Sequence, residues 1–332
     1  MRNSTIYFDK TYINSFYSCV GKLESEGPLG KYFDAKNDDG YFGEDSWEKA
    51  ESRMVKNTVS GVMTKNKSTP DDIDMIFGGD LLNQCVGSSF GLKEYGIPFF
   101  GLYGACSTFV EAVGISSAML SSGFSGKNIA TASSHFCSSE KQYRFPLEYG
   151  GVRTPTAQWT VTGCGAVVMS REKSPIKVSS MTIGSMKEKG VCDANNMGAA
   201  MAPAAADTIY RHFSCGKENI DDYDFIVTGD LADVGSELLI ELLKQDGMDI
   251  SEKHIDCGSL IFNNPVQGTN AGGSGCGCIA SVFCAYFAPK FVANEIKKAL
   301  FVGTGALMSP TTALLGEPIV GIAHGVTIEN EV

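Results

Sequence analysis

The sequence predicts an α/β protein made of two copies of one unit, folded as five alternating layers of helices and sheets (αβαβα). The segment Asp71–Leu81 recurs as Asp221–Leu231, and both read as a helix end, an acidic turn, an apolar strand and a Gly-Asp-Leu sequence that opens a helix. Three further pairs follow in the same order: Gly104–Ser107 with Asp256–Ser259, Lys127–Thr131 with Lys298–Val302, and Gly165–Val168 with His324–Thr327. Matches that keep their order predict the duplication of one large unit rather than a short-period repeat.

Two nearly uncharged stretches predict the middle layer. They begin near Cys106 and Gly275 and are apolar on every side. A helix of this kind is buried, so we expect both helices to lie between the two sheets. We place the boundary between the halves near Glu172–Pro175, which gives an N-terminal half of residues 1–172 and a C-terminal half of residues 173–332. Strands that alternate with helices predict a mostly parallel sheet in each half.

The composition is that of a globular protein, because 43% of the 332 residues are hydrophobic and 20% are charged. The formal net charge of −11 argues against nucleic acid as a partner, since no basic stripe is present to neutralise phosphates. The 11 cysteines are scattered and odd in number, and Met1–Tyr7 lacks the apolar core of a signal peptide. We therefore expect free thiols in a reducing compartment.

Two segments near the C-terminus predict structural roles rather than a metal site or a membrane span. Cys276-Gly277-Cys278 has no second pair of thiols at zinc spacing nearby, so close helix packing is favoured over a metal site. The uncharged run Ala271–Pro289 contains several glycines and is too short and mixed to span a bilayer. It predicts a buried central helix, and no transmembrane span is expected.

The N-terminal elements are expected in the following order. Residues 1–45 are irregular apart from a short strand at Ile6–Phe8. Glu44–Ser46 starts an amphipathic helix whose apolar residues recur at helical spacing, and Met75–Phe77 forms a strand.

The segment around Cys106 carries the most chemistry. The apolar run Ile97–Phe100 predicts a buried strand, Gly101 and Gly104 predict a tight turn, and Cys106 opens the helix. Free N–H groups and the dipole at a helix start lower the pKa of a thiol and bind anions. Cys106 is thus a candidate nucleophile or part of an anion site, with a small buried apolar residue as the alternative.

A polar excursion follows from Ser133 to Gln158 and has no counterpart of equal size in the second half. Loops of this kind usually determine specificity, so ligand contacts are expected from it. The segment Thr156–Ser170 then predicts a pair of strands.

A duplicated α/β unit with a cysteine at a buried helix start resembles the thiolase and ketoacyl synthase superfamily. The sequence is most similar to the stage V sporulation protein AD family, in segments that span nearly the whole chain and are highly specific in combination. They are Gly79–Gln84, Gly104–Thr108, Ser133–His135, Glu148–Gly151, Met201–Ile209, Gly272–Cys276 and Ile322–Val326.

This resemblance implies a function unlike that of a thiolase. The family is associated with the uptake of dipicolinic acid, usually as its calcium chelate, into the developing spore. Its members bind dipicolinate and work beside the membrane proteins of the same channel complex, peripheral to the spore inner membrane. The superfamily often places a dimer interface near the cysteine strand, so a homodimer is expected. No cofactor is implied, although the ligand can bring calcium.

Condensing enzymes need a base and an oxyanion donor beside the thiol. At three places where condensing enzymes carry a catalytic group, this sequence has a glycine or a segment that contains glycine. These places are Gly229, the Gly272–Ser274 turn and the Gly321–Ala323 segment. We expect that condensation activity is lost and that these glycines widen the pocket. Two alternatives stay open. One is an acyl-CoA-using acyltransferase with Cys106 as nucleophile and His324 as base, and the other is a structural scaffold for the channel proteins.

The ligand-site hypothesis follows from the duplication. If the two central helices start at one cleft, their positive ends suit a planar ligand with two carboxylates. The candidate ligand-binding residues are Cys106, Ser107, Ser134, His135, Arg144, Ser274 and His324.

Each candidate other than the serines has a structural alternative. His135 is as readily a surface residue, and His324 a core histidine. Arg144 has Glu140 and Glu148 as possible partners. Four further residues are not expected to contact a ligand. His212 and His254 are expected to be exposed, and Asp80 and Asp230 are expected to cap helices.

Overall fold

The computed structural model describes residues 4–144, 152–215 and 217–331. Two blocks of five strands form the two sheet layers. The N-terminal block has the order β2 (Tyr12–Val20), β8 (Gly163–Ser170), β6 (Lys127–Ser134), β4 (Met75–Gly79), β5 (Phe99–Gly101). The C-terminal block has the order β9 (Ile176–Thr182), β14 (Val320–Asn330), β13 (Lys298–Leu307), β10 (Phe225–Thr228), β11 (His254–Asp256). The blocks join at one edge, where Tyr12 and Ile13 pair with Lys177 and Ile176.

The predicted duplication is confirmed by the pairing of the strands. In each block the second strand is antiparallel to both the first and the third. The third, fourth and fifth strands are parallel to one another, so the two blocks match strand for strand. Each sheet is therefore mixed, and the expectation of mostly parallel sheets was wrong. The repeated acidic turns also match, because the Asp74 carboxylate accepts hydrogen bonds from the N–H groups of Gly126 and Lys127, and Asp224 does the same for Lys297 and Lys298.

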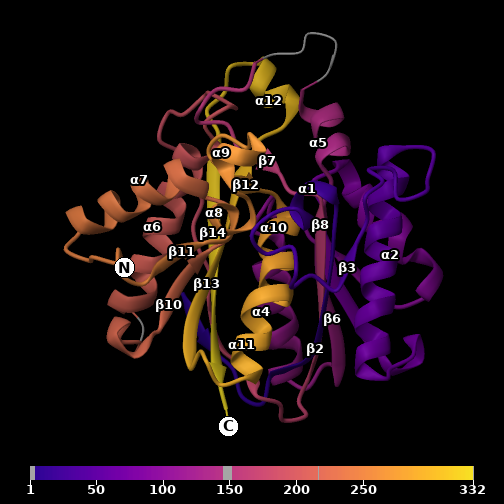
Figure 1. Cartoon of the computed structure of the whole chain (residues 1–332). Coiled ribbons are helices and arrows are strands. Elements are labelled where there is room, and N and C mark those ends of the chain that lie inside the picture. The colour runs from indigo at the N-terminus through magenta and orange to yellow at the C-terminus, as the bar shows by residue number, and fades with distance from the viewer. Residues whose placement is uncertain (1–3, 145–151, 216, 332) are drawn as a thin grey trace.

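Helices fill the other three layers (Figure 1). The central layer holds α4 (Thr108–Ser121) and a second segment made of α10 (Cys276–Val282), a π-helical turn (Phe283–Phe287) and α11 (Ala288–Val292). The outer layers are α2 (Trp47–Asn66) with α3 (Val86–Leu92), and α6 (Met197–Cys215) with α7 (Ala232–Gln245). The predicted five-layer architecture with two buried central helices is confirmed. No helix within the described ranges is both long and apolar enough to cross a bilayer.

Close packing of α10 on β8 depends on glycine. A Cβ added to Gly277 would lie 2.0 Å from the carbonyl oxygen of Gly163, and one added to Gly165 would lie 2.1 Å from that of Ala280. These distances are far below van der Waals contact, so only glycine lets the helix and the strand approach this closely. The π-helical turn continues the core, with Phe283 and Phe287 packed at 5.1 and 5.2 Å from the ring of Phe301.

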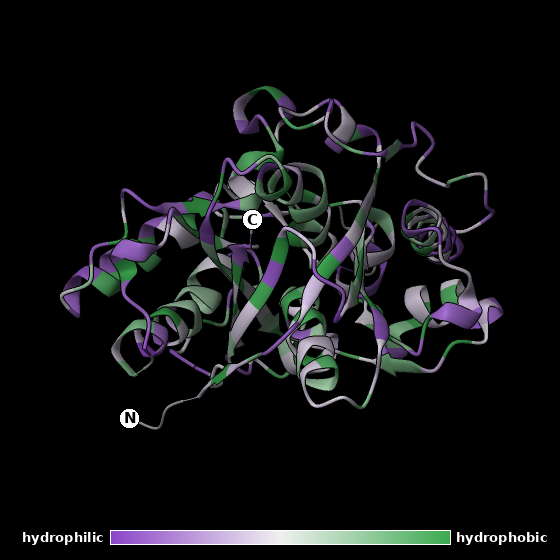
Figure 2. Ribbon diagram, turned by 90° about the horizontal axis from the view of Figure 1, so that it is seen from below, coloured by the Kyte–Doolittle hydropathy of each residue, from purple (hydrophilic) through white to green (hydrophobic). Residues whose placement is uncertain are grey.

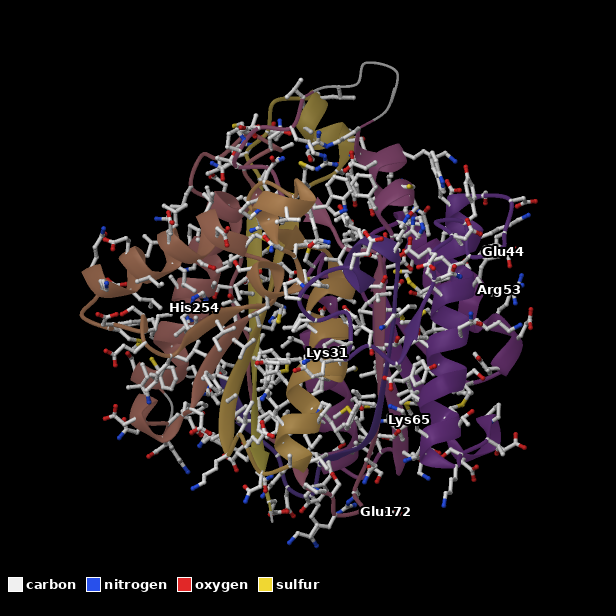
Figure 3. The ribbon with its side chains drawn as sticks, viewed as in Figure 1. Lys31, Glu44, Arg53, Lys65, Glu172 and His254 are labelled. Atoms are coloured by element: carbon white, nitrogen blue, oxygen red, sulfur yellow. The ribbon has the colours of Figure 1, made fainter. Side chains whose placement is uncertain are left out.

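The outer helix α2 forms as its sequence predicts. The Ser46 hydroxyl accepts a hydrogen bond from the N–H of Lys49 and caps the helix. Its apolar face is buried, while Arg53 pairs with Glu44 at 2.6 Å on the outer side (Figure 3). Over the whole molecule, hydrophilic segments lie mainly at the periphery and hydrophobic ones inside (Figure 2).

Several local expectations were wrong. Residues 1–45 contain the nine-residue strand β2, whose mixture of polar and aromatic residues hides its burial. Strand β5 lies at the edge of the sheet rather than inside it, and Phe100 is 51% exposed. The strand pair expected from Thr156 onward consists of β7 (Trp159–Thr160) and β8, but β7 pairs with β12 (Gly273–Ser274).

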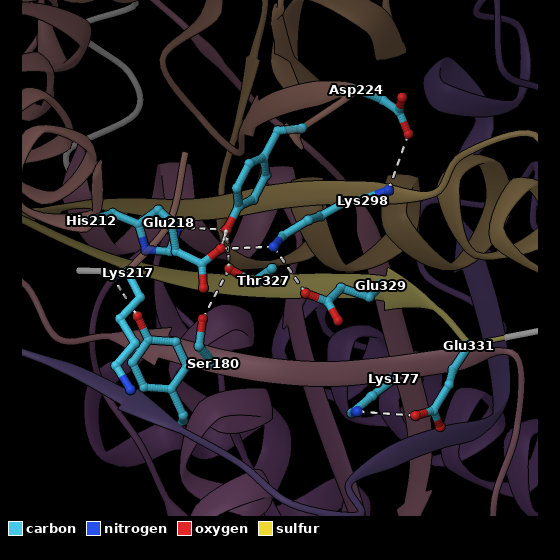
Figure 4. A network of polar contacts seen from close by, with 12 residues as sticks. Lys177, Ser180, His212, Lys217, Glu218, Asp224, Lys298, Thr327, Glu329 and Glu331 are labelled. Atoms are coloured by element: carbon cyan, nitrogen blue, oxygen red, sulfur yellow. Dashed lines mark hydrogen bonds and ion pairs between the residues drawn. The ribbon is translucent and has the colours of Figure 1, made fainter. Parts of the chain in front are cut away.

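The C-terminal half shows one confirmed expectation and one difference. The second central helix begins at Cys276, next to Gly275 as predicted, and α8 (Cys257–Ile261) and α9 (Asn264–Gln267) lie between it and the Asp256–Ser259 match. His212 is buried rather than exposed, and its Nε2 lies 2.8 Å from the hydroxyl of Tyr223. Tyr223 also bonds to Glu218, so a polar network fixes the histidine (Figure 4). The proposed boundary at residue 172 falls in the connection between β8 and β9.

Candidate ligand-binding site

The starts of the two central helices open on one cavity of about 80 Å³. Its wall includes residues from both halves: Cys106, Tyr143, Arg144, Gln158, Ser274 and Gly275. One water needs roughly 10–15 Å³ by this measure, so the cavity has room for a small molecule. The expectation that both helix starts face one cleft is confirmed.

A strained turn presents Cys106 to the cavity. Ala105 has φ of +49°, a conformation that costs a non-glycine residue free energy and that often marks functional sites. The turn is held by the hydroxyl of Thr108, which donates to the Ala105 carbonyl at 2.7 Å, and by the thiol of Cys276, which donates to it at 2.9 Å. Helix α4 then begins at Thr108, two residues after Cys106.

The environment of Cys106 favours the neutral thiol. Its Sγ lies 3.5 Å from the Ser274 hydroxyl, and only 6% of the residue is exposed. Burial, with a contribution from the carboxyl of Asp230, raises the pKa of Cys106 to about 12. The expected lowering of this pKa was wrong, because desolvation outweighs the hydrogen bonds from Ser274 and the N–H of Gly275.

None of the four histidines, all of which the structure describes, lines the cavity. Each bonds to a group elsewhere: His135 to Gly40 and Ser138, His212 to Thr182 and Tyr223, His254 to Thr228, and His324 to Gly184. His254 is half-buried rather than exposed. Burial lowers the pKa of His212 and of His254 to about 4, so both are neutral at neutral pH.

Three of the seven predicted site residues line the cavity: Cys106, Arg144 and Ser274. The others serve the fold. Ser107 donates to the carbonyl of Gly104, Ser134 donates to Val161 and accepts from Gly277, and the His135 and His324 bonds are those given above.

Arg144 stands at the end of α5 (Phe136–Tyr143) and is the one cation among the described residues that line the cavity. It lies 3.4 Å from the carboxylate of Glu140, one of the two structural partners considered for it, and donates to Asn195 Oδ1 at 2.6 Å. Glu140 also pairs with Arg153 at 2.6 Å, so two arginines share its charge. Arg144 is therefore only partly neutralised. Glu148, its other expected partner, lies outside the described residues.

The glycines that were predicted to replace catalytic groups do not widen the cavity. A Cβ on Gly229 would lie 3.0 Å from the Ile279 side chain, and one on Gly321 would lie 2.4 Å from the carbonyl oxygen of Ala200. Gly273 likewise faces packed side chains at 2.9–3.2 Å. These glycines allow close packing, so the expectation of a widened pocket was wrong.

Gln158 was not predicted as a site residue, and the role predicted for Asp230 was wrong. Gln158 lines the cavity, and its Nε2 donates to the main-chain carbonyl of Asp230 at 2.7 Å. The Asp230 carboxyl is fully buried, and the N–H groups of Leu231 and Ala232 beside it bond to Asp256 instead, whereas Asp80 at the matching position accepts from the N–H groups of Leu82 and Ser88. No feature of the repeated Gly-Asp-Leu sequence distinguishes the two aspartates.

Comparisons with solved structures define the class of fold. The 3-oxoacyl-[acyl-carrier-protein] synthase III of Aquifex aeolicus matches with a TM-score of 0.58 and 13% identity, over 96% of this chain and 99% of that one. Xanthomonas campestris OleA with bound acetamide matches with a TM-score of 0.63 and 11% identity, over 98% of this chain and all of that one. The protein therefore has the thiolase-like fold.

The sequence comparisons are more specific. The family model of stage V sporulation protein AD matches residues 2–329. The stage V sporulation protein AD of Bacillus subtilis (strain 168) is 42% identical over 328 residues, which cover 99% of this chain and 97% of that protein. The chain belongs to the stage V sporulation protein AD family.

Proposed function

We propose that this sporulation protein binds dipicolinic acid, free or as its calcium chelate, in the cavity at Cys106, and that it serves uptake of this ligand into the developing spore without catalysing a reaction. The observation that carries the proposal is the meeting of two helix starts and one partly neutralised arginine at a single small cavity. Positive helix ends and a guanidinium are what the carboxylates of a planar ligand need.

Calorimetry with purified protein and dipicolinate tests this proposal. Cys106→Asp and Ser274→Asp each place an added carboxylate where the ligand would bind, so each should weaken binding by about tenfold or more. Ser251→Asp makes the same change on the exposed surface and should leave the affinity unchanged. Equal affinity in all four proteins would remove this cavity as the site.

The absence of catalysis is part of the proposal. A thiol with a pKa near 12 is a poor nucleophile unless a base takes its proton, and the histidines lie elsewhere. The rival is acyl transfer from acyl-CoA to Cys106. Incubation with acyl-CoA and intact-mass spectrometry separates the two, because a covalent adduct that is lost in Cys106→Ser would support the enzyme.

The partners are also proposed, from membership of the family. By family, the protein would sit on the spore inner membrane beside the membrane proteins of the same channel complex. A pure scaffold would capture those membrane proteins without saturable binding of dipicolinate, so the two measurements together separate a scaffold from a binder.

A homodimer through β5 is also proposed. Among the described strands β5 pairs with β4 alone. Phe100 in this strand is 51% exposed, and Tyr103, two residues after it, is 44% exposed. An open, apolar strand edge favours pairing with a second copy. Light scattering should therefore find a dimer that Phe100→Lys converts to a monomer. A monomeric unaltered protein would contradict this arrangement.

A further inference from the structure

Two buried carboxyl groups lie close together in the N-terminal half, one on Glu51 of α2 and one on Asp80, which directly follows β4. Both residues are 0% exposed. A Cβ added to Gly87 would lie 3.1 Å from the carboxyl carbon of Glu51 and 3.2 Å from that of Asp80, so the two groups flank the same glycine. Two ionised carboxylates in this position repel each other, because burial leaves little water to screen their charges.

The groups that face this pair carry no positive charge to balance it. No lysine, arginine or histidine in the described part of the chain forms an ion pair with either carboxyl, and Lys141 of α5 pairs instead with Glu48 at 2.6 Å. His135 at the start of α5 bonds to the Gly40 carbonyl, and burial lowers its pKa. Three buried thiols also face the pair, and burial raises the pKa of each: those of Cys85, Cys164 and Cys276.

The hydrogen bonds show which carboxyl holds a proton. Asp80 accepts from two main-chain N–H groups at 2.9 and 2.7 Å, which stabilise its ionised form. Glu51 accepts from the hydroxyls of Ser133 at 3.0 Å and Ser138 at 2.7 Å. Burial first, and Asp80 second, raise the pKa of Glu51 to about 8, so Glu51 is the protonated partner at neutral pH.

Ser138 connects Glu51 to the wall of the cavity. It lies in the first turn of α5, and its Oγ is also 3.1 Å from the main-chain carbonyl of His135. A protonated Glu51 can therefore donate to this hydroxyl, which in turn donates to the carbonyl. Helix α5 ends at Tyr143, and both Tyr143 and Arg144 line the cavity. The charge on Glu51 thus bears on the position of the helix that carries them.

We propose that Glu51 and Asp80 share one proton and thereby make the docking of α5 on α2 sensitive to pH. While α5 is docked, the pair is closed off from water and keeps the proton. When α5 loosens, Glu51 reaches water and its pKa returns toward the usual 4.5. The docked form therefore holds a proton that the loosened form has lost, and docking weakens as the pH rises from about 4.5 to about 8.

Hydrogen–deuterium exchange of the intact protein, measured by mass spectrometry without ligand at pH 6 and pH 8, tests this proposal. After correction for the chemical exchange rate, opening of α5 should be about tenfold or more greater at pH 8. Glu51→Gln cannot ionise and keeps a donor for Ser138, so its opening should agree within about twofold at the two pH values. Glu51→Met, which also cannot ionise, covers the case in which the glutamine variant folds poorly.

Two control variants separate this pair from other carboxyls. Glu24 is also fully buried and burial raises its pKa to about 7, but it accepts from the N–H of Thr162 at 2.9 Å and has no carboxyl neighbour among its contacts. Glu24→Gln should keep the rise in α5 opening. Glu48→Gln removes the ion pair with Lys141, so it should loosen α5 at both pH values and also keep the rise.

The exchange experiment uses no ligand, so its result does not depend on dipicolinate binding. Equal opening of α5 at both pH values in the unaltered protein would overturn the proposal. So would a rise that persists when Glu51 is replaced, a rise that is lost in Glu24→Gln, or an equal rise in every helix, which would indicate global unfolding. A rise centred on α5 that disappears only when Glu51 is replaced supports the shared proton.

Discussion

At the scale of single residues, burial decides the chemistry of this protein more than sequence context does. Cys106 stands at a helix start, where sequence reasoning expects a reactive thiolate, yet burial raises its pKa to about 12. His212 lies between Arg211 and Phe213, and polar context predicted exposure, yet its ring is enclosed. Residue type and spacing located the Cys106 turn, Ser274 and Arg144. They could not give desolvation, because desolvation depends on atoms that are distant in the sequence.

Cys106 should therefore react slowly with alkylating agents. We expect that iodoacetamide at pH 7.5 labels the exposed Cys192 in the native protein and leaves Cys106 largely unlabelled, because the thiolate is the reactive form. Peptide mapping by mass spectrometry measures both sites in one sample, and unfolding in guanidinium should make both reactive. Labelling of native Cys106 as fast as Cys192 would contradict the assignment.

His212 should make stability depend on pH. Its pKa falls from 6.5 when unfolded to about 4 when folded, so its contribution is complete above pH 6.5 and is lost as the pH falls toward 4. Relative to the unaltered protein, His212→Gln should gain about 2 kcal/mol between pH 7.5 and pH 5, which is roughly 1.5 units at 1.36 kcal/mol each. Urea unfolding at the two pH values measures this difference. A constant difference between the proteins would count against a buried neutral histidine.

At the scale of helices and strands, local signals were reliable where one face of an element meets water. The amphipathic helix α2 and its cap at Ser46 were predicted because the helix buries one face and exposes residues on the other. Strand β2 was missed because its buried positions carry serine and tyrosine as well as apolar residues. The close approach of α10 to β8 also escaped prediction, since it requires knowing which glycines face each other.

Gly277→Ala tests that close approach. The added methyl group would lie 2.0 Å from the Gly163 carbonyl oxygen, so helix and strand must separate, and we expect a loss of about 2–3 kcal/mol in the free energy of unfolding. Gly40→Ala meets no atom within 4 Å and should cost less than about 0.5 kcal/mol. Chemical denaturation of both variants gives the comparison. Equal effects would show that α10 does not depend on this contact.

At the scale of the whole molecule, the two halves are interlocked rather than merely joined. Helix α10 of the C-terminal half packs on β8 and β6 of the N-terminal block, and α4 of the N-terminal half packs on β13 and β14 as well as on β4 and β6. The internal sequence matches predicted this doubled architecture. They could not show that each central helix packs on strands of the other half, because a repeat shows which segments are similar and not which segments are in contact.

The halves should therefore not fold alone. Residues 1–172 and 173–332, expressed separately, would each expose the core that the central helices share, and we expect neither to unfold cooperatively. Thermal melts by circular dichroism and dispersion of NMR amide signals measure this, with the intact chain as the control. A cooperative melt of either isolated half would show that the halves are independent domains.

The matching aspartates of the two halves show what a doubled chain permits. In the N-terminal half Asp80 receives the N–H groups of the following turn, whereas in the C-terminal half Asp256 receives those of Leu231 and Ala232. The Asp230 carboxyl is therefore not needed to hold this turn. A duplicated fold can thus keep one residue of a matching pair as a structural group while a third residue takes over that role in the other copy.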